Sequence, residues 1–153
     1  VRRLPDGAWL ALYEVLPREI QPSIRADIPT DLGWRLLGYD LEQNGDRLAV
    51  TTYWRIEKIP SDPMRWAWHY QPFHHLLDPE GHLLQNPSGW GVPGYLWRID
   101  DIYVDRTELA FPGNAARRPL RLELGLFDPN RGVRARFLLG TGEVETLVLR
   151  EWR

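Results

Sequence analysis

Short runs of alternating apolar and polar residues, separated by turn sequences rich in Gly and Pro, constrain the fold of this chain most. In residues 48–56 every second side chain is apolar or threonine, and a two-residue period is that of a strand with one buried face. Asn44-Gly45 lies just before this stretch, and Asn-Gly is the strongest short-range hairpin signal. A second alternation places four leucines on one face of residues 120–126. We therefore expect antiparallel strands joined by hairpins.

Turn residues divide the rest of the chain at similar intervals. Thirteen Pro and thirteen Gly separate about eight to ten short strands at a spacing of roughly 8–14 residues. Residues 98–104 and 106–111 are expected to be two of these strands. Such spacing is typical of a sandwich or barrel. The sequence therefore predicts an all-β fold, a jelly-roll-like antiparallel β-sandwich of about eight to ten strands.

A single domain is expected, because a chain of 153 residues is close to the usual domain size of about 100–150 residues. Pro17, Pro22 and Pro29 exclude a long helix near the start of the chain. We expect residues 1–32 to form an N-terminal segment that packs on a core sandwich of residues 33–153.

The composition argues against several functional classes. The formal net charge of −2 gives no general attraction to nucleic acid or anionic lipid. Because the chain has no Cys, it can form neither a disulfide nor a thiolate metal site. No run of about 18 apolar residues occurs, so we expect the domain itself not to span a membrane. The nucleophile-elbow and phosphate-binding glycine motifs are also missing, and we predict no catalytic residue and no cofactor.

Several segments occur in an order that carries a family resemblance. They are Gly38-Tyr39-Asp40-Leu41, the stretch from Leu48 to Arg55, His75-Leu76-Leu77-Asp78-Pro79-Glu80-Gly81, the stretch from Trp97 to Val104, and Leu122 to Pro129 followed by Gly132 and Arg134. Together they resemble the soluble C-terminal β-domain of bacterial multi-spanning, mannosyltransferase-like membrane glycosyltransferases. The resemblance covers roughly residues 36–149.

This resemblance implies a jelly-roll-like sandwich on the extracytoplasmic face of the cell envelope, associated with lipid-carried sugars or envelope glycans. It implies no catalysis by the domain, because the acidic residues of such transferases lie in a membrane portion that this sequence does not contain. Two departures stand out. The chain inserts Trp66 to Phe73 before the His-Leu-Leu-Asp turn, and Asn86 occupies the position where an acidic residue usually follows that turn.

Aromatic residues are the first candidates for ligand binding. Trp90, Tyr95 and Trp97 lie in a stretch rich in Gly and Pro that we expect to be a surface loop, where binding residues concentrate. Their rings could stack on the C–H faces of sugars. The alternative is that they fold inward over an open end of the sandwich. Trp66 and Trp68 share one face of a predicted strand and are expected in the core.

Arginines are the second candidates, since eighteen of the nineteen basic residues are Arg. Arg134 and Arg136 are two residues apart, so they share a strand face. A pair of guanidinium groups could bind phosphate or carboxylate. The alternative is an ordinary solvated sheet face.

A metal site is not expected. His74 and His75 point to opposite faces of a strand and cannot bind one ion without a bulge, whereas zinc needs three or four convergent ligands. Asp100, Asp101 and Asp105 could offer oxygen ligands to calcium. Because Asp100 and Asp101 also face opposite ways, a solvated loop edge or pairing with Arg is the better interpretation.

The leading hypothesis is a non-catalytic extracytoplasmic accessory module that binds glycan or lipid-linked sugar, or docks on a membrane protein partner. The alternative is a purely structural or protein-interaction module whose Trp residues fill the core. A hydrolase would need two carboxylates at a controlled separation. Glu123 and Glu145 could be proposed for that role, but nothing in the sequence distinguishes them from surface glutamates.

Overall fold

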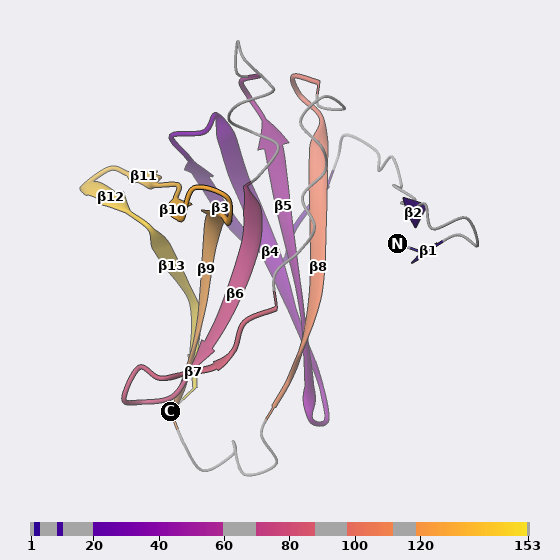
Figure 1. The fold of residues 1–153 in the computed structure, drawn as a ribbon, viewed down its shortest axis with the longest axis vertical. Coiled ribbons are helices and arrows are strands. Elements are labelled where there is room, and N and C mark those ends of the chain that lie inside the picture. Colours follow the sequence, from indigo (N-terminus) through magenta and orange to yellow (C-terminus); the bar gives the residue numbers. More distant parts are fainter. Residues whose placement is uncertain are drawn as a thin grey trace.

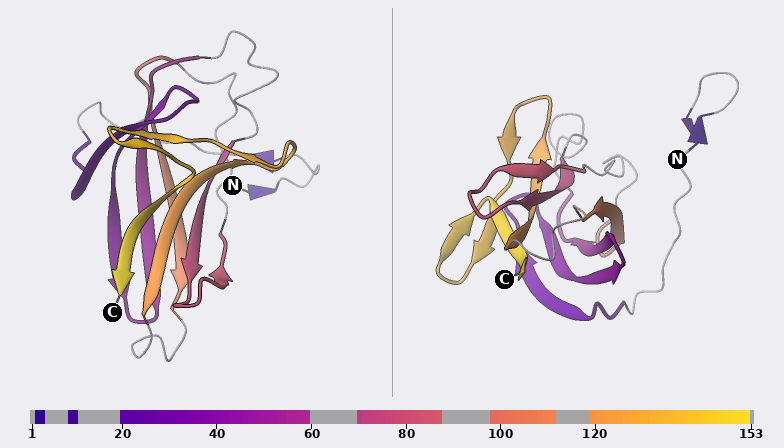
Figure 2. Two further views of the ribbon diagram at one scale, coloured as in Figure 1. Left: turned by 90° about the vertical axis from the view of Figure 1, so that its left-hand side faces the viewer. Right: turned by 90° about the horizontal axis from the view of Figure 1, so that it is seen from below.

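The computed structural model describes residues 2–3, 9–10, 20–59, 70–87, 98–111 and 119–152. Within these ranges all regular elements are strands, and two antiparallel sheets form a two-layered sandwich, whereas β1–β2 and β11–β12 are separate two-stranded sheets (Figures 1 and 2). The strands are β1 (Arg2–Arg3), β2 (Trp9–Leu10), β3 (Ile24–Pro29), β4 (Trp34–Asn44), β5 (Arg47–Ile56), β6 (Gln71–Leu77), β7 (Leu83–Gln85), β8 (Ile102–Ala110), β9 (Leu120–Asp128), β10 (Val133–Arg134), β11 (Phe137–Leu139), β12 (Gly142–Val144) and β13 (Thr146–Trp152). The predicted all-β antiparallel sandwich is confirmed.

One layer is a four-stranded sheet in the order β3-β4-β5-β8. Its β3 strand belongs to the predicted N-terminal segment 1–32 and pairs with β4. The expected hairpin joins β4 to β5, but Asn44 pairs with Arg47, so the two central turn residues are Gly45 and Asp46. Of these two only Gly45 has a positive φ, of 60°, as in a turn that needs Gly at its first central position.

The other layer is a five-stranded sheet in the order β10-β9-β6-β7, in which β13 also pairs with β9. The chain passes between the layers after β5, β7 and β8, so that β8 returns beside β5 and β9 lies beside β6. In immunoglobulin-like Greek-key sandwiches, strands A, B and E likewise face strands C, F and G. The strands β4, β5 and β8 correspond to the first set, and β6, β9 and β13 to the second.

The two predicted alternating faces meet in the core. Trp34 and Trp54 pack edge to face with ring centroids 5.9 Å apart, and Trp54 stacks on Phe137 at 6.2 Å. The buried face of β5 comprises Leu48, Val50, Thr52, Trp54 and Ile56, and that of β9 includes Leu120, Leu122, Leu124 and Leu126. Removing this apolar surface from water is the main stabilising contribution.

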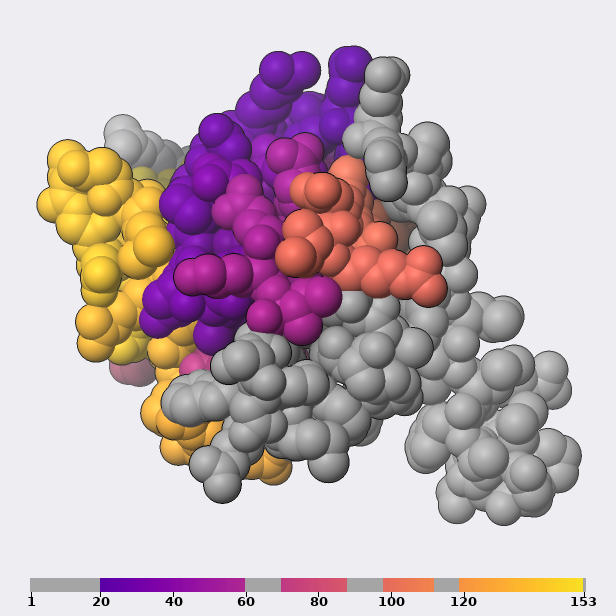
Figure 3. All heavy atoms as spheres, turned by 90° about the horizontal axis from the view of Figure 1, so that it is seen from above, coloured from indigo at the N-terminus to yellow at the C-terminus, as the bar shows by residue number. Residues whose placement is uncertain are grey.

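The C-terminal strands close one end of the sandwich. Thr30, just after β3, forms an isolated antiparallel bridge with Phe137 of β11, and Asp31 N–H donates to the Arg136 carbonyl at 3.0 Å. Figure 3 shows the C-terminal residues in yellow packed beside the first strands of the four-stranded sheet in indigo.

The prediction of two strands at 98–104 and 106–111 is wrong. A single strand, β8, runs from Ile102 to Ala110 and pairs with β5 along its length. Residues 98–101 form a turn instead, in which the Asp101 carboxylate accepts the Arg98 backbone N–H at 3.2 Å and Asp100 adopts a positive φ of 71°. The local hydrogen bonds of an aspartate compete with the strand ladder there.

Candidate functional site

The predicted loop aromatics Trp90, Tyr95 and Trp97 lie outside the described residues, as do Trp66 and Trp68. Their proposed roles in binding or in the core therefore stay predictions.

The two predicted arginines are both exposed, on either side of Ala135, which is 1% exposed. This agrees with the expected alternation. Each arginine nevertheless contacts a different glutamate. Arg136 Nη1 donates to Glu143 Oε2 at 2.9 Å, whereas Arg134 Nη1 lies 4.0 Å from Glu145 Oε2. The Arg134 guanidinium also lies over the Phe73 ring, 5.1 Å from its centroid.

Arg134 belongs to a group of side chains on the outer face of the five-stranded sheet. This outer-face cluster comprises Phe73, His75, Asn86, Glu123 and Arg134. The rings of Phe73 and His75 have centroids 4.2 Å apart. The Asn86 side chain hydrogen-bonds His75, and β6–β9 pairing places His75 opposite Glu123. An aromatic ring, an imidazole, an amide and two opposite charges are thus brought together.

Strand pairing explains how the cluster is held. Phe73 of β6 is paired with Gly125 of β9, and a Cβ added at Gly125 would overlap the Phe73 ring. Phe73 therefore lies against bare backbone and is only 4% exposed. The Phe73 ring in turn supports the Arg134 guanidinium, since a cation over an aromatic face is attracted by the ring's quadrupole.

The charge of the cluster depends on His75. Burial lowers the pKa of the His75 imidazole, and the positive charge of Arg134 lowers it further, while Glu123 and the Asn86 hydrogen bond act in the opposite direction. The imidazole is therefore neutral near pH 7 and offers one donor and one acceptor nitrogen.

The sequence reasoning missed Phe73, His75 and Asn86 as parts of a site. A signal for the first two was available, because residues two apart on a strand share a face. Their neighbours Glu123 and Gly125 could not be assigned without the β6–β9 register.

As predicted, His74 faces away from His75. The His74 side chain is fully buried between the sheets, where its Nδ1 lies 3.9 Å from Asp105 Oδ2 of β8. Burial lowers the pKa of His74 to about 4, helped by the nearby His75. Burial also raises the pKa of Asp105 to about 6, against a weak hydrogen bond from Tyr103. Asp105 was expected, with Asp100 and Asp101, at a solvated loop edge or paired with Arg. Instead it is 5% exposed because its side chain lies on the inner face of β8.

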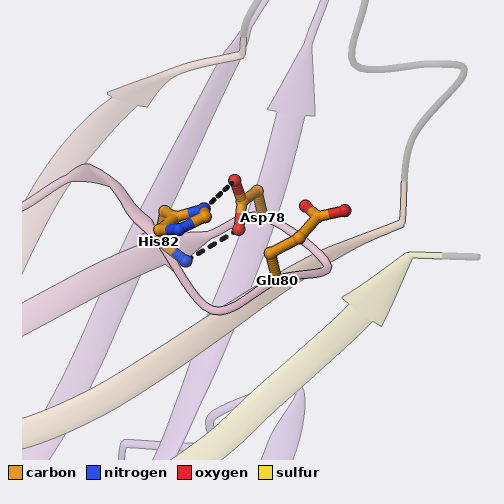
Figure 4. A group of neighbouring side chains, drawn as sticks. All are labelled: Asp78, Glu80 and His82. Carbon is orange, nitrogen blue, oxygen red and sulfur yellow. Dashed lines mark hydrogen bonds and ion pairs between the residues drawn. The ribbon is translucent and has the colours of Figure 1, made fainter.

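Among the described residues, one group has metal-ligand spacing. Ligand atoms of Asp78, Glu80 and His82 all lie within 4.8 Å of one another (Figure 4). The Asp78 carboxylate accepts the His82 backbone N–H at 2.7 Å and lies 3.0 Å from His82 Nδ1. These bonds close the turn between β6 and β7, so the group has a structural role without any ion.

Comparisons with known proteins add little. No family model and no curated protein matches the sequence. The crystal structure of a DUF3823 family protein from Bacteroides ovatus aligns with 76% of this chain and 53% of that chain, at 10% identity and a TM-score of 0.40. The chain thus spans about half the length of that protein. A similarity at this level indicates neither a shared family nor a shared function. In the part of the chain that the structure describes, no helix is long and apolar enough to cross a membrane.

Proposed function

We propose that this chain is a non-catalytic accessory module on the extracytoplasmic face of the cell envelope, where it binds a glycan or lipid-linked sugar for a membrane glycosyltransferase. The family resemblance of the ordered segments supports the location and the association. The observation that carries the binding role is the outer-face cluster, in which sugar-binding types of side chain lie on one rigid sheet face.

Arg134 is the main ligand contact in this proposal. Its guanidinium is oriented by Phe73, and its carboxylate contact, with Glu145, is loose at 4.0 Å. Because a guanidinium has five N–H donors in a fixed plane, most of them can reach a ligand. The side chain is 39% exposed. A pair of sugar hydroxyls, a phosphate or a uronic carboxylate would each match such a planar donor pair.

The rest of the cluster supplies the complementary groups. A sugar hydroxyl both donates and accepts a hydrogen bond, and so do the amide of Asn86 and the neutral imidazole of His75. Glu123 adds an acceptor, and its Oε1 forms an ion pair with Arg121 Nε at 2.9 Å. The sequence after Asn86 contains the predicted loop aromatics Trp90, Tyr95 and Trp97, which complete the proposal as stacking residues.

Two observations support binding over hydrolysis. Glu123 and Glu145, the carboxylates suggested for a hydrolase, each face an arginine, Arg121 and Arg134 respectively. A glycoside hydrolase needs two carboxyl groups at a controlled separation on either side of one glycosidic bond, whereas each of these two is paired with its own arginine.

Calorimetric titration of the whole chain with neutral and phosphorylated envelope sugars tests this function. We expect saturable binding that Arg134→Ala weakens by about 10- to 100-fold, the range for losing a hydrogen bond to a charged group. Arg106→Ala is the matched control, because Arg106 is an exposed arginine paired with Glu42 at 3.3 Å on the four-stranded sheet. Folded protein that binds none of these sugars, or equal losses in the two variants, would contradict the proposal and favour a purely structural module.

A further inference from the structure

Two ionisable side chains lie buried between the sheets and are not part of the proposed sugar site. His74 of β6 and Asp105 of β8 are 0% and 5% exposed. They belong to opposite layers, and β6 and β8 run close to each other in Figure 1. The pair therefore connects the two sheets where most sandwich residues are apolar.

The pair has few polar partners. Within the described residues, the two ring nitrogens of His74 have no hydrogen-bond partner, and the same is true of Asp105 Oδ2. Asp105 Oδ1 receives one long bond, from Tyr103 Oη at 3.5 Å. Thr52 is paired with Asp105 across β5 and β8, but its hydroxyl accepts the Trp54 Nε1–H at 2.8 Å. The imidazole thus lies 3.9 Å from a carboxyl group whose one hydrogen bond, from Tyr103, is long.

The titratable neighbours are similarly few. On β6 the adjacent His75 turns to the outer face, and on β8 Tyr103 is two residues away on the same face. The positions that β9 and β5 pair with His74 and Asp105 are Leu124 and Thr52, both uncharged. Hence no further charge among these positions stabilises an imidazolium or a carboxylate in the core.

An ion pair at 3.9 Å is one arrangement that the geometry allows. However, moving two full charges out of water costs several kcal/mol for each ion, and attraction offsets this only when hydrogen bonds are well formed. A carboxylic acid beside a neutral imidazole holds the same single proton without any charge. In a site so poor in donors and acceptors, the uncharged form is the more stable one.

We propose that His74 and Asp105 form an uncharged one-proton pair between the sheets in mildly acidic solution, with the proton on the carboxyl group. The pair then holds a proton in the core without placing any charge there.

The neighbouring contact at this seam is also polar. At the end of β8, Ala110 N–H donates to Gln85 Oε1 at 3.0 Å, and Gln85 Nε2 donates to the Ala110 carbonyl. The side chain of Gln85 in β7 thus makes the two backbone hydrogen bonds that a neighbouring strand would otherwise make with Ala110. Among the described residues β8 pairs with β5 alone in its sheet, and these contacts, together with the apolar packing of Leu109, join it to the other layer.

Nuclear magnetic resonance of the whole chain tests where the proton lies. At pH 5, which is between the pKa of His74, about 4, and that of Asp105, about 6, we expect one protonated and one bare ring nitrogen on His74. The Asp105 carboxyl carbon should have the shift of the acid. His74→Gln and Asp105→Asn identify the two signals, and the exposed His82 is an internal reference. Two protonated nitrogens on His74 with an ionised Asp105 would overturn the proposal.

Discussion

Asp105→Asn and His74→Gln should change the pH dependence of stability in opposite directions. In the folded chain the pair titrates near pH 4 and pH 6, and in the unfolded chain the same two groups have their ordinary values of 3.8 and 6.5. Both states therefore hold one proton between about pH 4 and 6. Folding moves that proton from the imidazole to the carboxyl group, and the pair makes stability nearly independent of pH in this range.

In Asp105→Asn the remaining His74 should keep its lowered pKa, because burial and His75 cause the shift, not Asp105. As the pH falls below about 6.5, the His74 imidazole then binds a proton in the unfolded chain but not yet in the folded chain. Stability is fully present above about pH 6.5 and is lost as the pH falls toward 4. With about 1.4 kcal/mol for each pKa unit, a fall from 6.5 to about 4 corresponds to about 3 kcal/mol.

In His74→Gln the remaining Asp105 has its pKa raised from 3.8 to about 6. The folded chain now binds the proton more tightly than the unfolded chain. Stability is fully present below about pH 4 and is lost as the pH rises through 6, again by about 3 kcal/mol.

Urea unfolding followed by Trp fluorescence between pH 4.5 and 7.5 checks both variants against the unaltered chain. Subtracting the unaltered profile removes the contribution of the other titrating groups. The two difference curves should slope in opposite directions. Parallel curves would refute the reasoning, because they would mean that burial does not set the two pKa values.

Two further predictions concern packing, and urea unfolding measures both. Gly125→Ala should destabilise the fold by about 1–3 kcal/mol, because its new Cβ would overlap the Phe73 ring. The control is Gly140→Ala, whose new Cβ meets no atom within 4 Å and should change the free energy of unfolding by less than about 0.5 kcal/mol. Equal effects of the two substitutions would count against the packing of Phe73 on Gly125. Leu124→Ala should cost about 2–5 kcal/mol, since its side chain is fully buried between the sheets, and a loss below about 1 kcal/mol would contradict that burial.

Features that depend only on the alternation of side chains along a single strand could be predicted from the sequence. The alternating faces of residues 48–56 and 120–126 are buried as expected, and Trp54 is a core residue. The opposite orientations of His74 and His75 also follow from the strand period alone. Each of these predictions needs only the geometry of one strand.

Features that depend on which strands meet could not be predicted. His74 and Asp105 face each other because the chain crosses between layers after β7, and no local pattern specifies that crossover. The place of Phe73 on Gly125 needs the β6–β9 register. Arg134 and Arg136 share an exposed side as the period requires, but β10 ends at Arg134, so each arginine meets a different glutamate.

The binding role of the outer-face cluster is the central claim, and chemical-shift mapping tests it most directly. A sugar that binds in the titration is added to isotope-labelled whole chain. We expect shift changes at the backbone amides of His75, Gly125 and Arg134, with little change at Arg55 and Arg106 of the four-stranded sheet. Changes centred on the four-stranded sheet, with His75 and Arg134 unaffected at saturation, would contradict it.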